Sequence, residues 1–381
     1  MKIAVNTRFL MKNYLEGYGN FIYEIFKRIS EKHSEIEFIF IFDRSYEPEF
    51  IFGPNIKPVV IGPKARHPLL WRFWYEFSVP KVLKKYKADI FISCDGMCSL
   101  NTNVPQCVVI HDLAFLHYPA GSKRSHLSFL KKFTPKFISN AKSVITVSEF
   151  SKNDIIKNYQ TESNKIKVIY NGVKEIFYPL SHELRELVRK KYSDNKEYFI
   201  YVGSIHPRKN LINLLKAFSV FKKRMQSGMK LMIVGRLAWK YDSFLNSLEN
   251  YKYKKDVILP GFVGDDELAN LIGASYAMVY PSLFEGFGVP VLEALKCNVP
   301  VITSSGSAME EITKGKALYA DANNYNDIAE KMMILYKDES LRKKLIDEGR
   351  DVAKQYNWDK AATEFWDCMM NIIDDQVAIV K

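Results

Sequence analysis

The chain has 381 residues, of which 47% are hydrophobic and 26% charged, and Lys and Arg exceed Asp and Glu by 12. This length suits two domains, and the composition excludes a disordered, collagen-like or low-complexity protein. No apolar run reaches 18 residues and acids interrupt the first 30, so neither a membrane-spanning helix nor a secretory signal is expected. The five cysteines lack metal-like spacing and indicate reduced thiols.

The surplus of positive charge lies mostly in the first half of the chain. Residues 57–142 contain 14 basic and 4 acidic residues. Such a one-sided basic domain predicts an anionic partner, which could be nucleic acid, an anionic lipid or a phosphorylated substrate, whereas the simpler interpretation is a lysine-rich soluble surface. No recognised nucleic-acid-binding module accompanies the charge, so nucleic acid is not the expected partner.

Apolar segments alternate with helical ones along the first 172 residues. Met1–Asn6 predicts a buried strand, and after Gly17 and Gly19 a helix extends through Ile29 with apolar residues at helical spacing. Later strands are predicted over Glu37–Phe42, Asp89–Ser93, Gln106–Ile110, Ser143–Val147 and Ile166–Tyr170.

The same alternation restarts after the turn signal Asn171-Gly172. The predicted strands are Tyr198–Val202, Lys230–Val234, Val257–Leu259, Ala277–Tyr280 and Pro300–Thr303, with helices over Leu211–Met225 and Pro290–Lys296. Continuous apolar strands separated by helices indicate parallel sheets covered on both faces. We therefore expect an α/β protein with two Rossmann-like doubly wound domains, 1–172 and 173–359, facing across a cleft, and a last helix, 360–381, packing back on the first domain.

Ligands of such folds bind at the carboxyl ends of the strands. The strand that ends at Gly203 is followed by Arg208 and Lys209, just before the helix that begins near Leu211. Two cations at the start of a helix oppose its dipole, so they fit best if an anion is held there by the side chains and free backbone N–H groups. The alternative is a solvated basic turn.

A second group of candidate residues follows the strand Ala277–Tyr280. Pro290 suits the first turn of a helix, which places Glu285 in the preceding loop and Glu293 within the helix. Gly286 and Gly288 would let backbone amides approach a ligand closely. Two carboxylates beside two anion sites fit a sugar nucleotide, with hydroxyls for the acids and a diphosphate for the cations. The alternatives are a helix-capping acid, a loop acid, or the carboxylate pair of a glycosidase, which suits these phosphate-binding surroundings less well.

Two further side chains follow strands of the first half. His111 comes after Gln106–Ile110, and Asp112 is positioned to orient it, which fits a site role, although many such histidines are structural. Ser148 more often caps the next helix than binds an acceptor.

These segments together resemble glycosyltransferase family 4, retaining enzymes of GT-B fold similar to the bacterial mannosyl- and glucosyltransferases of surface-polysaccharide assembly. The resemblance covers nearly the whole chain through EGYGNFIYEI, VIHDLAFLHYP, ITVSEFSKNDI, VIYNGV, YVGSIHPRKNL, MIVGR, LPGFV, YPSLFEGFGVPVLEAL and QYNWDKAATEFW. Two positions depart from the family pattern. Lys174 replaces a common acid, and Asn298 replaces a common glycine but tolerates the left-handed conformation.

The resemblance implies a role for each matched residue. Arg208 and Lys209 would bind the donor diphosphate and compensate charge on the departing nucleotide. Glu285 would bind the transferred sugar, Glu293 the ribose, and His111 would lie by the reacting carbon. The other donor contacts implied are Gly17 and Gly19 over the phosphates, Gly203 at its strand end, Gly235, Phe262 and Val263 around the base, and the backbone of Phe287, Gly288 and Val289.

The activity implied is transfer of a hexose, with retained configuration, to a growing glycan or lipid-linked saccharide of a surface polysaccharide such as lipopolysaccharide. GDP-mannose is the favoured donor and a UDP-sugar the alternative. The metal-carrying motif Asp-x-Asp is absent, so no metal or cofactor is expected. Two other functions stay open, namely a nucleotide-sugar epimerase or hydrolase and a non-catalytic relative that binds sugar nucleotides.

The acceptors of such enzymes are often lipid diphosphates at the cytoplasmic leaflet, which would explain the basic first half. The aromatic and basic residues from Trp71 to Lys87 suit peripheral contact with an anionic membrane, and a packed surface helix explains them too. The expected location is cytoplasmic, at the cytoplasmic face of the inner membrane.

Overall fold

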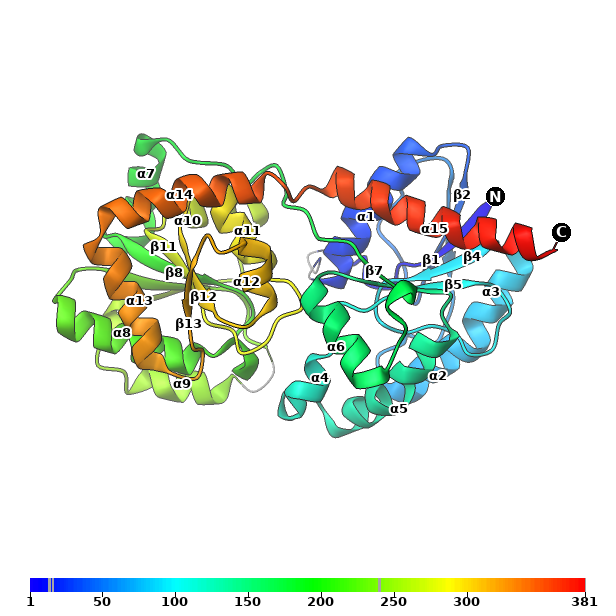
Figure 1. Ribbon diagram of the computed structural model, residues 1–381, viewed down its shortest axis with the longest axis horizontal. Coiled ribbons are helices and arrows are strands. Elements are labelled where there is room, and N and C mark those ends of the chain that lie inside the picture. Colours follow the sequence, from blue (N-terminus) through cyan, green and yellow to red (C-terminus); the bar gives the residue numbers. More distant parts are fainter. Residues whose placement is uncertain (13–14, 16, 239–240, 381) are drawn as a thin grey trace. The chain divides into compact units, whose positions relative to one another are not determined.

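The structure is a computed structural model that describes residues 1–12, 15, 17–238 and 241–380, and for 375–380 the backbone only. The chain divides into two compact units, Met1–Gly172 with Trp358–Lys381, and Val173–Asn357. Figure 1 shows a central sheet with helices on both faces in each unit. Within the described residues, no helix is both long and apolar enough to cross a membrane.

The first unit contains a seven-stranded parallel sheet in the order β3-β2-β1-β4-β5-β6-β7. Its strands are β1 (Lys2–Asn6), β2 (Glu37–Phe42), β3 (Ile56–Val60), β4 (Ile90–Ser93), β5 (Gln106–Val109), β6 (Ser143–Thr146) and β7 (Ile166–Val168). Strand β3 was not predicted from the sequence. This strand lies at the edge of the sheet and contains Pro58, which an edge strand tolerates but which breaks the apolar pattern.

Helices cover both faces of this sheet. They are α1 (Tyr18–Lys32), α2 (Pro68–Phe73), the π-helix η2 (Trp74–Ser78), α3 (Val79–Tyr86), α4 (Ala114–His117), α5 (Arg124–Asn140), α6 (Glu149–Tyr159) and α15 (Trp358–Val380), with short 3-10 turns η1 (Pro48–Phe50), η3 (Pro119–Gly121) and η4 (Ser163–Lys165). The last helix, α15, packs along α1 (Figure 1), where Arg28 Nε lies 2.7 Å from Asp359 Oδ1 and His33 stacks on Trp366.

The second unit contains a six-stranded parallel sheet in the order β10-β9-β8-β11-β12-β13. Its strands are β8 (Tyr198–Val202), β9 (Lys230–Val234), β10 (Val257–Gly261), β11 (Ala277–Tyr280), β12 (Val301–Ser304) and β13 (Leu318–Ala320). Its helices are α7 (His182–Ser193), α8 (Leu211–Met225), α9 (Asp242–Glu249), α10 (Asp265–Gly273), α11 (Val289–Lys296), α12 (Ala308–Thr313), α13 (Tyr325–Lys337) and α14 (Glu339–Ala353), with 3-10 turns η5 (Pro207–Lys209) and η6 (Lys254–Asp256). The three-residue edge strand β13 was not predicted.

The strand order of each sheet reverses at one point. In the first unit the reversal lies between β1 and β4, and in the second it lies between β8 and β11. Side chains that follow these four strands therefore stand where open α/β sheets bind ligands. Both polar sites described below lie at these strand ends.

Candidate active site

Three charged side chains meet at the carboxyl ends of β8 and β11. Arg208 and Lys209 belong to the turn η5 after β8, and Glu285 belongs to the loop after β11. One Glu285 oxygen lies 3.1 Å from the Arg208 guanidinium, and the other accepts a hydrogen bond from the Lys209 ammonium. We call these three residues the donor-side cluster. Lys209 and Glu285 are buried, whereas the Arg208 side chain is 20% exposed.

Two hydroxyl groups that were not selected from the sequence also contact this cluster. The Lys209 ammonium donates to Tyr280 Oη at 2.9 Å, and Ser282 Oγ donates to Glu285 Oε1 at 2.6 Å. Tyr280 ends β11 and Ser282 follows it, so both obey the strand-end rule that singled out Arg208. They hold the ammonium and the carboxylate in fixed positions.

The three side chains of the cluster are two cations and one carboxylate, so together they carry one net positive charge. Burial by itself raises the pKa of Glu285, but the charges of Lys209 and Arg208 outweigh it and lower this pKa to about 2. Glu285 is therefore ionised at neutral pH, and it is the anion that faces the two cations at the entrance of α8. Two cations against one carboxylate leave the group suited to a further anion.

The turn that carries the cations is fastened to the β11 loop. Asn210 adopts a left-handed conformation with φ of 64°, and its side chain donates to the carbonyls of Pro281 at 3.0 Å and Ala322 at 2.6 Å. The Leu283 N–H donates to the Arg208 carbonyl at 2.9 Å. The asparagine of the HPRKN segment is therefore a structural residue that fixes the position of the neighbouring cations.

Four predicted donor contacts lie at the ends of three neighbouring strands, and three of them, Gly235, Phe262 and Val263, are the residues predicted to surround the base. Gly203 follows β8, Gly235 follows β9, and Phe262 and Val263 follow β10. A Cβ atom on Gly235 would lie 2.1 Å from the Gly203 carbonyl oxygen, so only glycine allows these strand ends to approach each other. Phe262 is 61% exposed, which leaves its ring available to a ligand.

The contacts of Glu293 differ from those of the donor-side cluster. It stands in α11, which begins after Gly288 at Val289 with Phe287 packed before it. Within the described residues its carboxyl group makes no hydrogen bond or ion pair, and its charged neighbours are Lys174 and Asp265. Burial raises the pKa of Glu293 to about 8, Lys174 opposing the shift and Asp265 adding to it.

The two departures from the family pattern have structural explanations. Lys174 Nζ pairs with Asp265 Oδ2 at 2.8 Å and so places a positive charge near Glu293. Asn298 adopts φ of 59°, which confirms that this asparagine takes the left-handed conformation.

In the first unit, His111 follows β5 and is held by backbone. Its Nε2 lies 3.1 Å from the Cys94 carbonyl, and its ring packs on Tyr18 and Phe21. Because a carbonyl only accepts, Nε2 carries the proton. Burial lowers the pKa of His111 to about 4, against the effects of the Cys94 carbonyl and Asp112, so the ring is neutral at pH 7.

The structure corrects the role given to Asp112 and supplies one for Ser148. Asp112 Oδ1 accepts from the Ala114 N–H at 2.9 Å and stabilises the turn after His111, whereas the Cys94 carbonyl orients the imidazole. Asp112 acts on the ring through its charge. The prediction that Ser148 caps a helix is confirmed, because its Oγ accepts from the Ser151 N–H at 3.0 Å.

The two N-terminal glycines have different surroundings. Gly17 precedes α1, and its carbonyl accepts from the Phe21 N–H at 3.0 Å. Gly19 is buried, and a Cβ atom there would lie 2.5 Å from the Phe9 carbonyl oxygen. Gly19 therefore has a packing requirement of its own, while Glu16 of the same segment lies outside the described residues.

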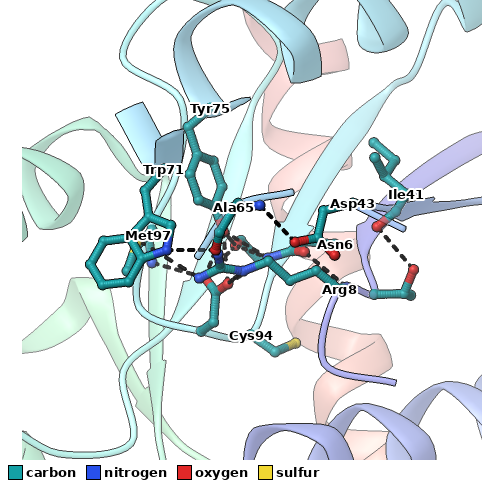
Figure 2. Close-up of polar contacts among 12 residues, drawn as sticks. Asn6, Arg8, Ile41, Asp43, Ala65, Trp71, Tyr75, Cys94 and Met97 are labelled. Atoms are coloured by element: carbon teal, nitrogen blue, oxygen red, sulfur yellow. Dashed lines mark hydrogen bonds and ion pairs between the residues drawn. The ribbon is translucent and has the colours of Figure 1, made fainter. Parts of the chain in front are cut away.

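A buried network that the sequence analysis missed lies at the reversal point of the first sheet (Figure 2). Arg8 Nε pairs with Asp95 Oδ2 at 2.5 Å, and the Tyr75 hydroxyl donates to Asp95 Oδ1 at 2.7 Å. Asn6 Nδ2 donates to both Tyr75 Oη and Asp95 Oδ2. We call these four residues the Arg8–Asp95 network. Asp95 is adjacent in sequence to Cys94, whose carbonyl holds His111.

Comparison with known proteins identifies the family. The model "Glycosyltransferase Family 4" matches residues 16–175, and "Glycosyl transferases group 1" matches residues 185–352. The O-antigen chain mannosyltransferase RfbU of Salmonella typhimurium strain LT2 is 30% identical over 277 residues, which are 71% of this chain and 72% of RfbU. The chain belongs to glycosyltransferase family 4.

Further comparisons agree with this assignment. The O-antigen chain mannosyltransferase B of Escherichia coli is 28% identical to this glycosyltransferase over 255 residues, 67% of each chain. The sucrose-phosphate synthase structure from Thermosynechococcus elongatus superposes with a TM-score of 0.80 at 15% identity, covering 98% of this chain and 99% of that one, and shows the shared fold. The predictions of a GT-B fold with two parallel-sheet α/β domains and of a glycosyltransferase are confirmed.

Proposed function

We propose that this glycosyltransferase moves mannose from GDP-mannose to a glycan or lipid-linked saccharide in surface-polysaccharide biosynthesis, with retained configuration and without a metal ion. The observation that carries the proposal is the donor-side cluster, in which Arg208 and Lys209 face one carboxylate at the carboxyl ends of β8 and β11. The two relatives, both O-antigen mannosyltransferases by name, support the choice of sugar and pathway.

The surplus positive charge of the cluster suits the donor diphosphate. Arg208 presents a planar fork that binds phosphate oxygens bidentately, and Lys209 adds a point charge beside it. The ionised Glu285 accepts hydrogen bonds from hydroxyls of the transferred sugar, and Glu293 accepts them from the ribose. The remaining donor contacts assigned are Gly17, Gly19, Gly203, Gly235, Phe262, Val263, Phe287, Gly288 and Val289.

The chemical step needs stabilisation of negative charge on the leaving group. The acceptor hydroxyl attacks the anomeric carbon on the face from which the diphosphate departs, the carbon–oxygen bond to phosphate breaks, and a phosphate oxygen takes the hydroxyl proton. Arg208 and Lys209 stabilise the departing GDP, which is the electrostatic task of a metal ion in other transferases. His111, neutral at pH 7, contacts the sugar hydroxyls without adding a charge.

The basic first unit is assigned to the acceptor side. Residues 57–142 contain 14 basic and 4 acidic residues, which suits peripheral contact with the anionic cytoplasmic face of the inner membrane. A lipid-linked acceptor would reside in that membrane.

The deciding experiment is thermal unfolding of the purified chain with saturating GDP, UDP, ADP or dTDP in EDTA. A ligand that binds only the folded protein at 100 times its Kd adds about 2.7 kcal/mol to the free energy of unfolding. We expect GDP to give the largest shift. Transfer from GDP-mannose in EDTA, followed by NMR of the product anomer, then tests metal independence and retention.

Each part of the proposal has its own contrary result. A shift with UDP alone would replace the donor by a UDP-sugar. If sugar transfer stops in EDTA and resumes when magnesium is added, the enzyme requires a metal ion and that part of the proposal is overturned. A melting temperature unchanged by all four nucleotides would overturn the assignment of the donor-side cluster.

A further inference from the structure

The helical segment from α2 through η2 has two different faces. Its inner face carries Trp71, whose indole N–H donates to the Ala65 carbonyl at 2.7 Å, and Tyr75, a member of the Arg8–Asp95 network (Figure 2). Its outer face carries the side chains of Leu69, Phe73 and Phe77, which are 73%, 50% and 51% exposed. These three residues recur every four positions, so they form one stripe, which we call the apolar ridge.

The apolar ridge borders a groove of about 550 Å³. The groove lies between this segment and α5. Trp71 and Phe129 are in contact across the two elements, and Figure 1 shows α2 beside α5. Phe133 of α5 lines the groove beside Phe73 and Phe77. Exposed apolar side chains that gather along a groove and are bordered by polar residues are typical of an interaction site.

Positive charges surround the ridge. Arg72 and Lys136 line the groove, and Lys132 stands beside them, all three exposed and each within 6 Å of the Phe133 ring centroid. Glu76, the acid among the lining residues, already accepts from the Leu100 N–H at 3.1 Å. The partner that complements this surface has an apolar interior and an anionic face.

We propose that the apolar ridge and its cations form a docking surface for an anionic phospholipid bilayer. Phe73 and Phe77 insert at the headgroup level, where aromatic rings are favoured, and Arg72, Lys132 and Lys136 bind lipid phosphates. A second copy of the chain is a poorer occupant, because in a symmetric contact this basic rim would face another basic rim.

This surface deepens the proposed function, on which it rests for the lipid-linked nature of the acceptor. A helix with its side chains is about 10–12 Å across. The bilayer would therefore lie one helix thickness from the Arg8–Asp95 network, at the carboxyl ends of β1 and β4. Docking would bring the acceptor's diphosphate and sugars to the ligand-binding edge of the first sheet.

The test uses the full chain and sedimentation with vesicles. The wild-type protein should bind vesicles of 70% phosphatidylcholine and 30% phosphatidylglycerol at least about tenfold more tightly than pure phosphatidylcholine. The double variant Phe73→Asp/Phe77→Asp should lose at least about tenfold in affinity for the anionic vesicles. Arg72→Gln/Lys136→Gln should lose about fivefold per charge removed.

The matched control is Leu187→Asp in the second unit, where an apolar side chain of similar exposure, 63%, lies outside the ridge. It should bind vesicles as the wild type does. A cooperative thermal unfolding transition at the wild-type temperature, measured without nucleotide, shows that each variant is folded.

Wild-type protein that ignores anionic vesicles, or binds neutral ones equally, would overturn this assignment. A Phe73→Asp/Phe77→Asp variant that binds vesicles as well as the wild type does would also overturn it. If the same substitutions instead convert a dimer to a monomer and leave vesicle binding unchanged, the ridge is an interface with a second copy of the chain. If the protein binds anionic vesicles but no nucleotide changes its melting temperature, the proposed function is overturned and the docking surface is still supported.

Discussion

The two units place buried charges at the same topological position and differ in how those charges are balanced. In the first unit, Arg8 pairs with Asp95, and their side chains are 4% and 0% exposed. In the second unit, Arg208 and Lys209 both pair with the carboxylate of Glu285, and the Arg208 side chain is 20% exposed. The first arrangement is closed and neutral, and the second is partly open and positive.

This difference shows that position at the reversal point does not by itself define a ligand site. A neutral, sealed pair has no unsatisfied charge to offer, so its contribution is to hold β1, β4 and η2 together. A group with surplus charge and partial exposure lowers its free energy by binding an anion. This contrast favours a stabilising role for the Arg8–Asp95 network and is consistent with the donor binding proposed for the donor-side cluster.

The largest effect should come from breaking the sealed pair. Asp95→Ala leaves the Arg8 guanidinium buried without its counter-ion, which should lower the free energy of unfolding by about 3–5 kcal/mol. Urea denaturation measures the loss. The control is Asp359→Ala, which removes a carboxylate that pairs with Arg28. The Asp359 side chain is 88% exposed, so its loss should cost less than about 1 kcal/mol. Equal small losses in both variants would show that the network does not hold the unit together.

The next effect concerns catalysis. Lys209→Ala should lower kcat/KM at least about 100-fold, a loss of about 2.7–4 kcal/mol in transition-state stabilisation, as for removal of an oxyanion donor. The control is Lys222→Ala, because Lys222 is similarly buried and pairs with Asp256 at 3.0 Å. The control should lose stability but keep its kcat/KM. Wild-type kcat/KM in Lys209→Ala would remove this lysine from the transition-state interactions.

The central strands were predictable because they are continuous apolar segments. The segments Glu37–Phe42, Tyr198–Val202 and Lys230–Val234 have the bounds expected from sequence. The edge strands β3 and β13 were missed, since an edge strand needs fewer buried residues and tolerates a proline such as Pro58.

For the site, only residues that are close together in the sequence could be linked to each other before the structure was known. Arg208 and Lys209 were found because they follow a strand and oppose a helix dipole. The pairing of Arg8 with Asp95 joins residues 87 positions apart, and no local pattern shows it. The predicted partner of His111, Asp112, was wrong for the same reason. The His111 ring forms a hydrogen bond with the carbonyl of Cys94, which follows a neighbouring strand, and Asp112 accepts from the Ala114 N–H instead.

A third variant sharpens the contrast by increasing the charge surplus. Glu285→Gln keeps the side-chain shape but removes the carboxylate that pairs with Arg208 and Lys209. Free GDP should then bind about tenfold more tightly, a gain of about 1.4 kcal/mol, because the diphosphate no longer shares these cations with a carboxylate, while sugar transfer falls because the sugar loses its carboxylate. Calorimetric titration measures the affinity. Unchanged or weaker GDP binding would mean that Glu285 does not compete with the diphosphate for these cations.

The smallest expected effect is a proton released by Glu293 when nucleotide binds. With a pKa raised to about 8 by burial, this carboxyl group is about 90% protonated at pH 7 in the ligand-free protein. Because its folded-state pKa exceeds the ordinary value, its contribution to folding stability falls as the pH rises from about 4.5 to 8. Ribose hydroxyls that donate to Glu293 favour the ionised form, so GDP binding at pH 7 should release close to one proton.

Calorimetry of GDP binding in phosphate and in Tris buffer measures that proton, because the two buffers differ in ionisation enthalpy. Glu293→Gln is the control, since it retains the size of the side chain and removes its titration, and the wild-type release minus that of the variant isolates the contribution of Glu293. The Arg8–Asp95 network offers no counterpart, because its charges are paired before any ligand arrives. Equal proton release by both proteins would mean that Glu293 does not change ionisation when the nucleotide binds, and the ribose would then need a different acceptor.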